Sequence, residues 1–404
     1  MGVRKDSRDL ESKRKLISAA LLSLASFAAS INLLFAAIVR IGQEFSVKPE
    51  ILASISSIYF ACFFAISLLA GYLSDRYGTR PILSAGSLFT LLGGLTFIFS
   101  STPLSLVAGT IAMGIGGGVI ESMSSALLAR LFPDRERFAV NLSQAGYCLG
   151  AIAGPFLMGI FVPRGVGWRT FFLPVALLGL ANFGLFTTSR FPAKPREKPI
   201  NPQTAIGALR RWSVVQLGIV TFLYVLAETG VVGFLNIYLF EFSRAPEGIS
   251  IQSISYFWSV MLVGRMLCGL LPGEPDERKL IFSTMTLGAV SIAFSFLSRD
   301  WRFSLACFLI AGFFMAGSWP TTIALTAARH RDHASTVVGA SVAMGSLGCI
   351  VCPPIMGFLF QLTNPALVMG LPAIPLLLGG LFVLHIPPTV ERGPSNAGSD
   401  NLAA

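Results

Sequence analysis

The chain has 404 residues and a formal net charge of +10 at pH 7. Only 12% of its residues are charged, about half the share found in soluble domains, while 53% are hydrophobic and 33 are phenylalanine. This composition excludes an ordinary water-soluble protein and favours a chain that lies mostly in lipid.

Apolar runs recur along the whole sequence, and each is long enough for a helix that crosses a bilayer, which takes about 20 residues. Short polar loops separate the runs, so we predict an all-α integral membrane protein. The first run follows the basic stretch RKDSRDLESKRK and is longer than the core of a cleavable signal peptide, so we expect a retained helix. The twelve predicted spans are 16–39, 52–73, 81–100, 103–129, 138–162, 169–189, 213–241, 250–271, 279–298, 301–327, 334–361 and 366–386.

The basic residues of the loops predict the orientation, because cytoplasmic loops are enriched in Lys and Arg. With the N-terminus in the cytoplasm, 22 of the 30 basic residues lie on that side, seven lie outside and Arg265 lies within a span. We therefore expect a multi-pass protein of a bacterial-type inner membrane with both termini cytoplasmic. The same distribution accounts for the positive net charge without a nucleic-acid partner.

The sequence matches itself at a constant offset of 198 residues. The matched positions include Gly114 with Gly312, Gly150 with Gly348, Pro155 with Pro353, and Met158–Gly159 with Met356–Gly357. Because each half contains six spans, an even number, the halves must be parallel repeats. The expected organisation is an N-tail (1–15), a first half (16–189), a cytoplasmic linker (190–212), a second half (213–386) and a disordered C-tail (387–404).

The loop between the second and third spans, residues 71–81, reads GYLSDRYGTRP. Gly71 would let two helices approach closely, Gly78 would permit a tight turn, and Asp75 could pair with arginines or a helix N-terminus. We interpret this loop as a gate that holds the cytoplasmic face shut; the alternative is a charged loop that only sets topology. The second half has Gly273 where Asp75 would fall, which predicts a weaker gate there.

This loop resembles the cytoplasmic signature of the major facilitator superfamily, G-x-L-x-D-R-x-G-x-R. The resemblance implies two six-helix halves that face each other across a site near the middle of the membrane and open alternately to its two sides. The matching residues are Gly71, Leu73, Asp75, Arg76, Gly78 and Arg80.

Only two carboxylates lie clearly inside predicted spans, Glu121 in the fourth and Glu228 in the seventh. An intramembrane charge costs about 2.5–3.5 kcal/mol on insertion scales and normally faces a cavity or a partner. Without a nearby cation a buried carboxyl favours its protonated form, so either residue could carry a proton. The structural alternative is a hydrogen bond between helices, or a pair with Arg265 in the eighth span. Glu121 is the better proton candidate, because no basic residue precedes Arg130 in its span.

Amide side chains supply candidate substrate contacts. Asn141 and Gln144 are three residues apart at the start of the fifth span, so they project from one helix face. Amides suit hydrogen bonding to hydroxyls or carbonyls, although they also hold membrane helices together. Further candidates are Asn32, Asn236 and Tyr224, the last of which precedes Glu228 by one helical turn.

Three stretches resemble the fucose permease group of the superfamily, which comprises fucose:proton symporters and related sugar transporters. They are GGGVIESMSSALLARLFPDRERFAVNLSQ, FLYVLAETGVVGFLNIYL and YFWSVMLVGRMLCGLL. The resemblance implies that Glu121 carries the proton and that Asn141 and Gln144 contact sugar. Its other matches are Glu228 and the pair Gly264–Arg265. The first span departs from the group, because it offers Asn32 and no acid where the group has a substrate-binding Asp.

A competing signal lies in the fifth span. GAIAGPFLMG, residues 150–159, nearly matches the G-x-x-x-G-P-x-x-G-G motif of proton-coupled drug antiporters. Small residues also let membrane helices pack and bend, and the repeat copy GCIVCPPIMG favours that reading. We interpret the segment as a packing element, and antiport stays open as the alternative.

These patterns predict a secondary carrier driven by the proton motive force, without a cofactor. We expect proton-coupled uptake of a small polar, sugar-like solute; the alternatives are a proton-driven exporter and, more remotely, a receptor or scaffold with a carrier fold. No phosphate-binding loop, nucleophile–base pair or metal-ligand cluster is evident in the sequence, so we expect neither enzymatic activity nor catalytic residues. The expected partners are the solute, protons and membrane lipid, and the expected state is a monomer.

Overall fold

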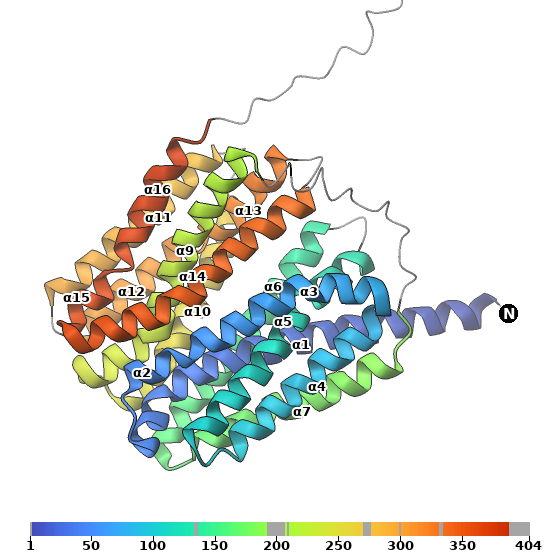
Figure 1. Cartoon of the computed structure of the whole chain (residues 1–404), viewed down its shortest axis with the longest axis horizontal. Helices are drawn as coiled ribbons and strands as arrows, with labels where there is room; N and C mark the ends of the chain where they lie inside the picture. The colour runs from blue at the N-terminus through green and yellow to red at the C-terminus, as the bar shows by residue number, and fades with distance from the viewer. Residues whose placement is uncertain are drawn as a thin grey trace, which may run out of the picture.

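The computed structural model describes residues 2–132, 136–191, 207, 210–269, 276–298, 300–330 and 334–387. Over these residues the chain forms helices, short helical turns and loops without a strand, as its composition predicts. The helices run as one elongated bundle (Figure 1). They are α1 (Gly2–Phe45), α2 (Pro49–Ala53), α3 (Ile55–Tyr77), α4 (Thr79–Ile98), α5 (Pro103–Leu131), α6 (Glu136–Phe161), α7 (Phe172–Thr188), α9 (Trp212–Ile237), α10 (Glu247–Gly269), α11 (Glu277–Phe294), α12 (Trp301–Met315), α13 (Ser318–Arg329), α14 (Ala334–Leu362), α15 (Pro365–Gly370) and α16 (Ala373–Leu384).

Ten segments of the described chain are long and apolar enough to cross a membrane. The other two expected spans, 250–271 and 279–298, coincide with α10 and α11, which are helical but carry more polar side chains. Helices therefore occupy all twelve expected positions. Helix α1 begins at Gly2, so most of the segment expected as a separate N-tail continues the first helix.

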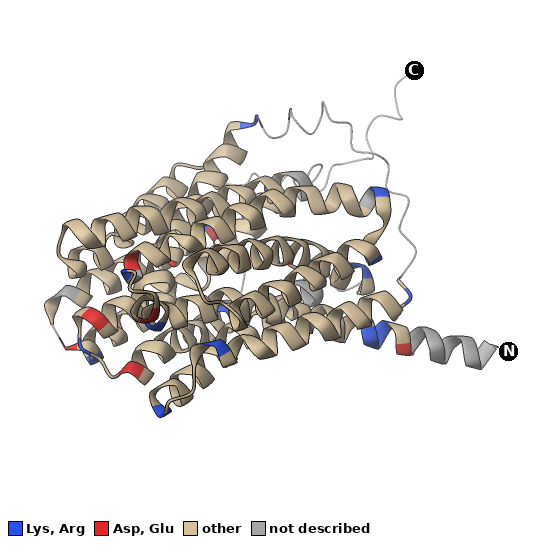
Figure 2. Cartoon of the chain, turned by 60° about the horizontal axis from the view of Figure 1, so that its bottom comes forward, with Lys and Arg blue, Asp and Glu red and all other residues tan. Residues whose placement is uncertain are grey.

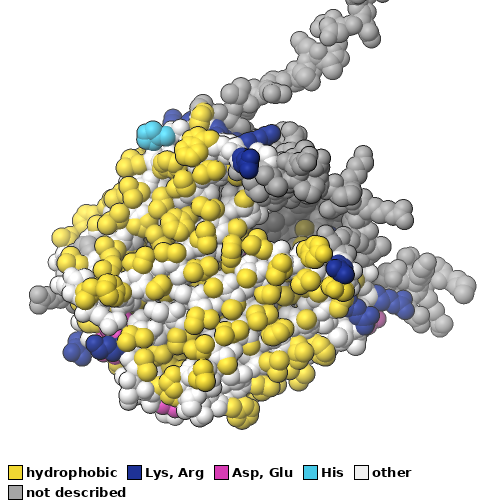
Figure 3. All heavy atoms as spheres, in the orientation of Figure 1, with side chains coloured by type: hydrophobic (Ala, Val, Ile, Leu, Met, Phe, Trp, Pro, Cys, Tyr) yellow, Lys and Arg dark blue, Asp and Glu magenta, His cyan; other side chains and the backbone are white. Residues whose placement is uncertain are grey.

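Many large hydrophobic side chains are exposed on the outer surface, which is unusual for a soluble protein. Leu68, Leu104 and Phe358 are among its exposed large hydrophobic residues, and hydrophobic side chains spread over the face drawn in Figure 3. Lys, Arg, Asp and Glu gather toward the two ends of the helices (Figure 2). An apolar belt between two charged ends is the surface that a bilayer requires.

The turn between α3 and α4 has a conformation that glycine adopts far more easily than other residues. Gly78 has a φ of +92°, in the left-handed region, so the predicted tight turn is confirmed. Gly71 has no close neighbour in this conformation, because a Cβ added there would meet no atom within 4 Å. The halves diverge at this end of the bundle (Figure 1), so the packing role of Gly71 in a closed gate stays a prediction.

The two halves, α1 to α7 and α9 to α16, repeat their helix contacts at the 198-residue offset. Gly114 of α5 packs on Tyr59 of α3, where an added Cβ would lie 2.5 Å from the Tyr59 carbonyl oxygen. Gly312 of α12 packs on Phe257 of α10, where an added Cβ would lie 2.7 Å from the ring. The 198-residue offset relates Gly114 to Gly312 and Tyr59 to Phe257, so the same helix contact occurs in both halves. The predicted parallel repeat is confirmed.

The halves press together at the far end of the bundle, which is the end opposite the N-terminus (Figure 1). Gly159 of α6 meets Gly248 of α10, and a Cβ on either would lie 2.6 Å from the other residue's carbonyl oxygen. Gly357 of α14 packs directly on the Glu50 carbonyl of α2. The 198-residue offset also relates these two contacts, because it pairs Gly159 with Gly357 and Glu50 with Gly248. Each half therefore supplies one glycine that packs on the other half and closes the far end.

Polar contacts reinforce this closure. The Ser255 hydroxyl of α10 donates to the Ile152 carbonyl of α6 at 2.7 Å. Arg40 of α1 makes a bidentate ion pair with Glu247 of α10, in which Nη2 lies 2.6 Å from Oε2. Toward the opposite end, where the N-terminus lies, the ribbons of the two halves diverge (Figure 1).

Candidate functional site

Side chains from both halves meet around Arg265 of α10. Its Nη1 donates to Gln144 Oε1 of α6 at 3.2 Å, and its Nη2 lies 4.0 Å from Glu228 Oε1 of α9. The guanidinium also lies 5.9 Å from the centroid of the Trp258 ring. The side chains of Arg265 and Glu228 are 16% and 17% exposed. The structure thus unites one predicted amide, one predicted acid and the membrane-embedded arginine.

Glu228 is held chiefly by its own helix. The Tyr224 hydroxyl donates to Glu228 Oε1 at 2.9 Å, because residues four apart lie on the same helix face. Tyr224 is 1% exposed, and its ring lies 6.2 Å from that of Trp319. At 4.0 Å the contact between Glu228 and Arg265 is too long for a hydrogen bond, so this ion pair is loose.

Asn32 positions an aromatic ring of the site. Its Oδ1 accepts from Trp258 Nε1 at 2.7 Å, and its Nδ2 donates to the Ala28 carbonyl of the same helix at 2.8 Å. The Trp258 ring in turn contacts Tyr147 of α6, with centroids 5.3 Å apart. With both amide atoms engaged, Asn32 acts on the site through Trp258.

Glu121 lies on α5, and its Oε2 is buried with no hydrogen-bond partner among the described residues. Glycines bring α5 close to its neighbours here: a Cβ on Gly117 would lie 2.7 Å from the Phe27 ring. Tyr147 lies within electrostatic range of both Glu121 and Glu228. Among the described residues, Glu228 has a basic side chain within 4.0 Å, and no such ion pair is found for Glu121.

The remaining predicted residues lie elsewhere. Asn236 is 1% exposed, and its Nδ2 donates to the Ala36 carbonyl of α1 at 2.8 Å, so it ties the halves together near the far end. Arg76 and Arg80 of the gate loop are exposed and Leu73 is half-buried. The side chains of Asn141 and Asp75 lie outside the described part of the structure, so their roles stay predictions.

Sequence reasoning missed three aromatic residues of the site, Tyr147, Trp258 and Trp319. Two of them had a usable signal: Tyr147 follows Gln144 by three residues, and Trp258 precedes Arg265 by two helical turns. Each therefore shares a helix face with a polar site residue. In an apolar span, however, the sequence does not distinguish an aromatic residue of a site from one that faces lipid.

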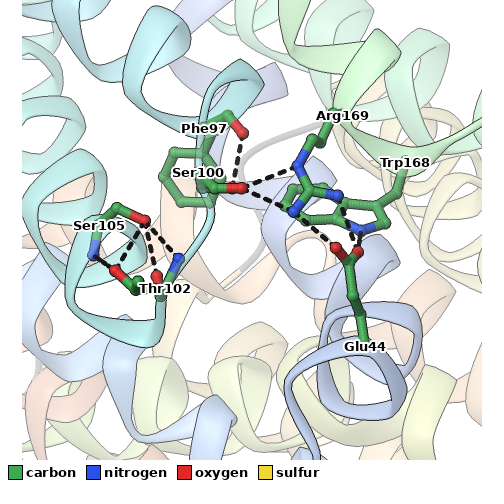
Figure 4. Close-up of polar contacts among 7 residues, drawn as sticks. All are labelled: Glu44, Phe97, Ser100, Thr102, Ser105, Trp168 and Arg169. Carbon is green, nitrogen blue, oxygen red and sulfur yellow. Dashed lines mark hydrogen bonds and ion pairs between the residues drawn. The ribbon is translucent and has the colours of Figure 1, made fainter.

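A second polar cluster, also missed, joins loops of the first half at the far end (Figure 4). Arg169 donates to the Ser100 carbonyl through Nε at 3.1 Å and Nη2 at 2.7 Å, and it pairs with Glu44 at 2.7 Å. Trp168 Nε1 also donates to Glu44, at 2.8 Å. Arg169 thus fastens the loop before α7 to the end of α1 and to the loop after α4.

We expect Arg169→Ala to lower the free energy of unfolding by about 1–3 kcal/mol, because it leaves a buried carbonyl without its donors. Glu44→Gln should cost only about 0–1 kcal/mol, because that side chain is 42% exposed and the exposed ion pair is weak. Thermal unfolding of both variants in detergent would compare them. Equal losses of stability in the two variants would contradict the conclusion that Arg169 holds these loops together.

The sequence pattern of the Major Facilitator Superfamily matches residues 19–271 and 217–403. The chain belongs to the Major Facilitator Superfamily. It is therefore a multi-pass membrane transporter of a small-molecule substrate, not an enzyme, and the family resemblance of the gate loop is confirmed.

Its similar proteins in the superfamily include transporters of different classes. The glucose/mannose transporter GlcP of Bacillus subtilis (strain 168) is 25% identical over 345 residues, which cover 81% of this chain and 84% of the relative. The multidrug resistance protein MdtL of Shigella flexneri serotype 5b (strain 8401) is 26% identical over 156 residues, 38% of this chain and 40% of the relative.

Two solved transporter structures share the fold. A D-xylose-proton symporter has a TM-score of 0.73 at 17% identity, over 93% of this chain and 98% of that one. The transporter FucP in its outward conformation has a TM-score of 0.67 at 17% identity, over 94% of this chain and all (100%) of that one. At such identities the likeness shows the fold alone.

Proposed function

We propose that the protein takes up a small polar, sugar-like solute together with protons by alternating access. The observation that carries the proposal is the pair of intramembrane acids in unlike surroundings. Glu228 is hydrogen-bonded to Tyr224 and lies beside Arg265, whereas Glu121 has a buried oxygen without a partner among the described residues. A carboxyl that has no basic partner among the described residues is suited to gain and lose a proton as the site changes its exposure.

The site chemistry favours a polar solute. Gln144 and Arg265 offer hydrogen-bonding groups, while Trp258 and Tyr147 offer ring faces on which a sugar-like ring can pack. Both halves contribute to this set, as alternating access requires. The sugar transporters among the similar proteins support the same reading.

Proton-driven export is the second candidate, supported by the relative named as a multidrug resistance protein. The glycines of residues 150–159 give it little further support, because helix packing accounts for them. Gly150 packs directly on the Ala25 carbonyl of α1, and a Cβ on Gly154 would lie 3.0 Å from Leu33. An arginine at the site also disfavours cationic drugs.

We also propose the orientation that the loop charges predict, with both termini in the cytoplasm of a bacterial-type cell, a lipid-embedded monomer, and gating by residues 71–81. In that orientation the far end faces outward, so the described conformation is closed to the outside. The linker 190–212 would then connect the halves on the cytoplasmic side; most of it lies outside the described residues.

The test uses weakly buffered, de-energised vesicles that hold the protein with its N-terminus inward. Sugars and sugar acids are added while the external pH is recorded. Alkalinisation with one solute, absent from vesicles without the protein, is the result we expect. Acidification as amphipathic compounds enter in exchange for internal protons, with no response to sugars, would favour export.

A further inference from the structure

We propose that the transported solute carries a carboxylate and that Arg265 binds it through the edge of the guanidinium formed by Nε and Nη2. The inference rests on the proposed function, because it names the chemical class of the solute of the same site. Within sugar-like solutes it points to sugar acids.

One donor on this edge of Arg265 has no partner, although Tyr224 and Cys148 also interact with the guanidinium. Nη1 is engaged by Gln144 at 3.2 Å, whereas Nε is buried with no acceptor among the described residues. The Nη2 atom has Glu228 Oε1 beside it at 4.0 Å, beyond hydrogen-bonding distance. Two adjacent donors of a planar fork are the pattern that a carboxylate engages with both oxygens.

Two other arginines of the chain show the same edge in use. Arg40 directs Nε and Nη2 to the two carboxylate oxygens of Glu247. Arg278 directs Nε to Oδ1 of Asp276 at 3.2 Å and Nη2 to Oδ2 at 2.9 Å. Arg265 differs because its neighbouring acid, Glu228, makes no hydrogen bond to Nε or Nη2.

The surroundings of Arg265 keep it ready for a ligand. Gln144 fixes one nitrogen, and the guanidinium lies over Trp258, whose own N–H is held by Asn32. Glu228 has Tyr224 as its hydrogen-bond donor, so it does not depend on Arg265 for a partner. A solute carboxylate can therefore bind Arg265 without leaving Glu228 unsatisfied.

Binding to the purified full chain tests the inference, using matched pairs of probes that differ in charge: glucuronate with glucose, and benzoate with benzamide. Quenching of tryptophan fluorescence and thermal stabilisation report binding without a proton gradient. In at least one pair we expect the carboxylate to bind about tenfold or more tightly than its neutral counterpart, the usual advantage of a charge-assisted bidentate contact.

Arg265→Gln should abolish that preference, and Arg265→Lys should retain only part of it, because lysine keeps the charge without the fork. The matched control is Arg302→Gln, whose side chain is 73% exposed at the far end and which should bind like the unmodified protein. The comparison of probes on the unmodified protein stands even if a variant fails to fold.

The inference fails if neither carboxylate binds more tightly than its neutral counterpart, or if Arg265→Gln keeps the preference. These outcomes are separable from those of the proposed function. Proton movement driven by a neutral sugar, without carboxylate preference, would keep proton-coupled uptake and overturn the inference. Carboxylate binding through Arg265 without proton movement by any solute would keep the inference and overturn proton coupling.

Discussion

Glu121→Gln should abolish accumulation of the solute driven by a pH gradient, while exchange of solute across the membrane continues. Glutamine has nearly the same shape but cannot gain or lose a proton. Exchange requires only that the loaded site reorient, and the neutral amide resembles a protonated carboxyl during that step. Accumulation requires the proton to leave on the other side, which glutamine prevents.

Two assays on the same vesicles separate these steps. The first measures uptake of labelled solute against an imposed pH gradient, and the second measures exchange of labelled for unlabelled solute at equal pH. The matched control is Glu11→Gln, which removes an acid that is 65% exposed and pairs with Lys15 in the first helix. Loss of both activities in Glu121→Gln, with a normal melting curve, would make Glu121 a binding residue and not the proton carrier.

The sequence predicted the architecture because the solvent dictates it. A chain surrounded by lipid must hide its backbone polar groups in helices and expose apolar side chains, so composition and run length were enough to predict the helical spans. The turn at Gly78 was predictable for a similarly local reason, since its conformation depends on one residue. The repeat was visible because the same offset recurs in several spans.

The site was predicted only in part, because its contacts join residues far apart in the chain. Glu228 and Arg265 were noticed as charges within apolar runs, yet the link between Arg265 and Gln144 spans 121 residues and depends on how the halves dock. Trp258 carries no charge to reveal it. Asn236 was predicted as a site residue from its polarity alone. Only the structure shows that it donates to a backbone carbonyl of α1 and so links the two halves.

Gly357→Val should hold the far end open and slow transport by about fivefold or more. The glycine lies directly on the Glu50 carbonyl, and overpacking a close contact costs about 1–3 kcal/mol, which shifts the balance between closed and open states by roughly five- to 150-fold. Its repeat counterpart, Gly159→Val, should act in the same direction, because it faces the backbone of Gly248.

Spin labels at Gln43 and Thr363, exposed far-end positions in opposite halves, would report the opening as a longer distance between them. The control is Gly184→Val in α7, where an added Cβ meets nothing within 4 Å, and we expect neither the distance nor the transport rate to change. Because α7 does not take part in the far-end closure, a changed distance in the control would mean that helix stability, and not the contact at Gly357, sets the balance between closed and open states.

An unchanged distance in Gly357→Val, together with slow transport, would mean that the substitution acts within one half and not on the contact between the halves. Opening in both far-end variants would establish that two glycine contacts, repeated at one offset, set how tightly this carrier closes.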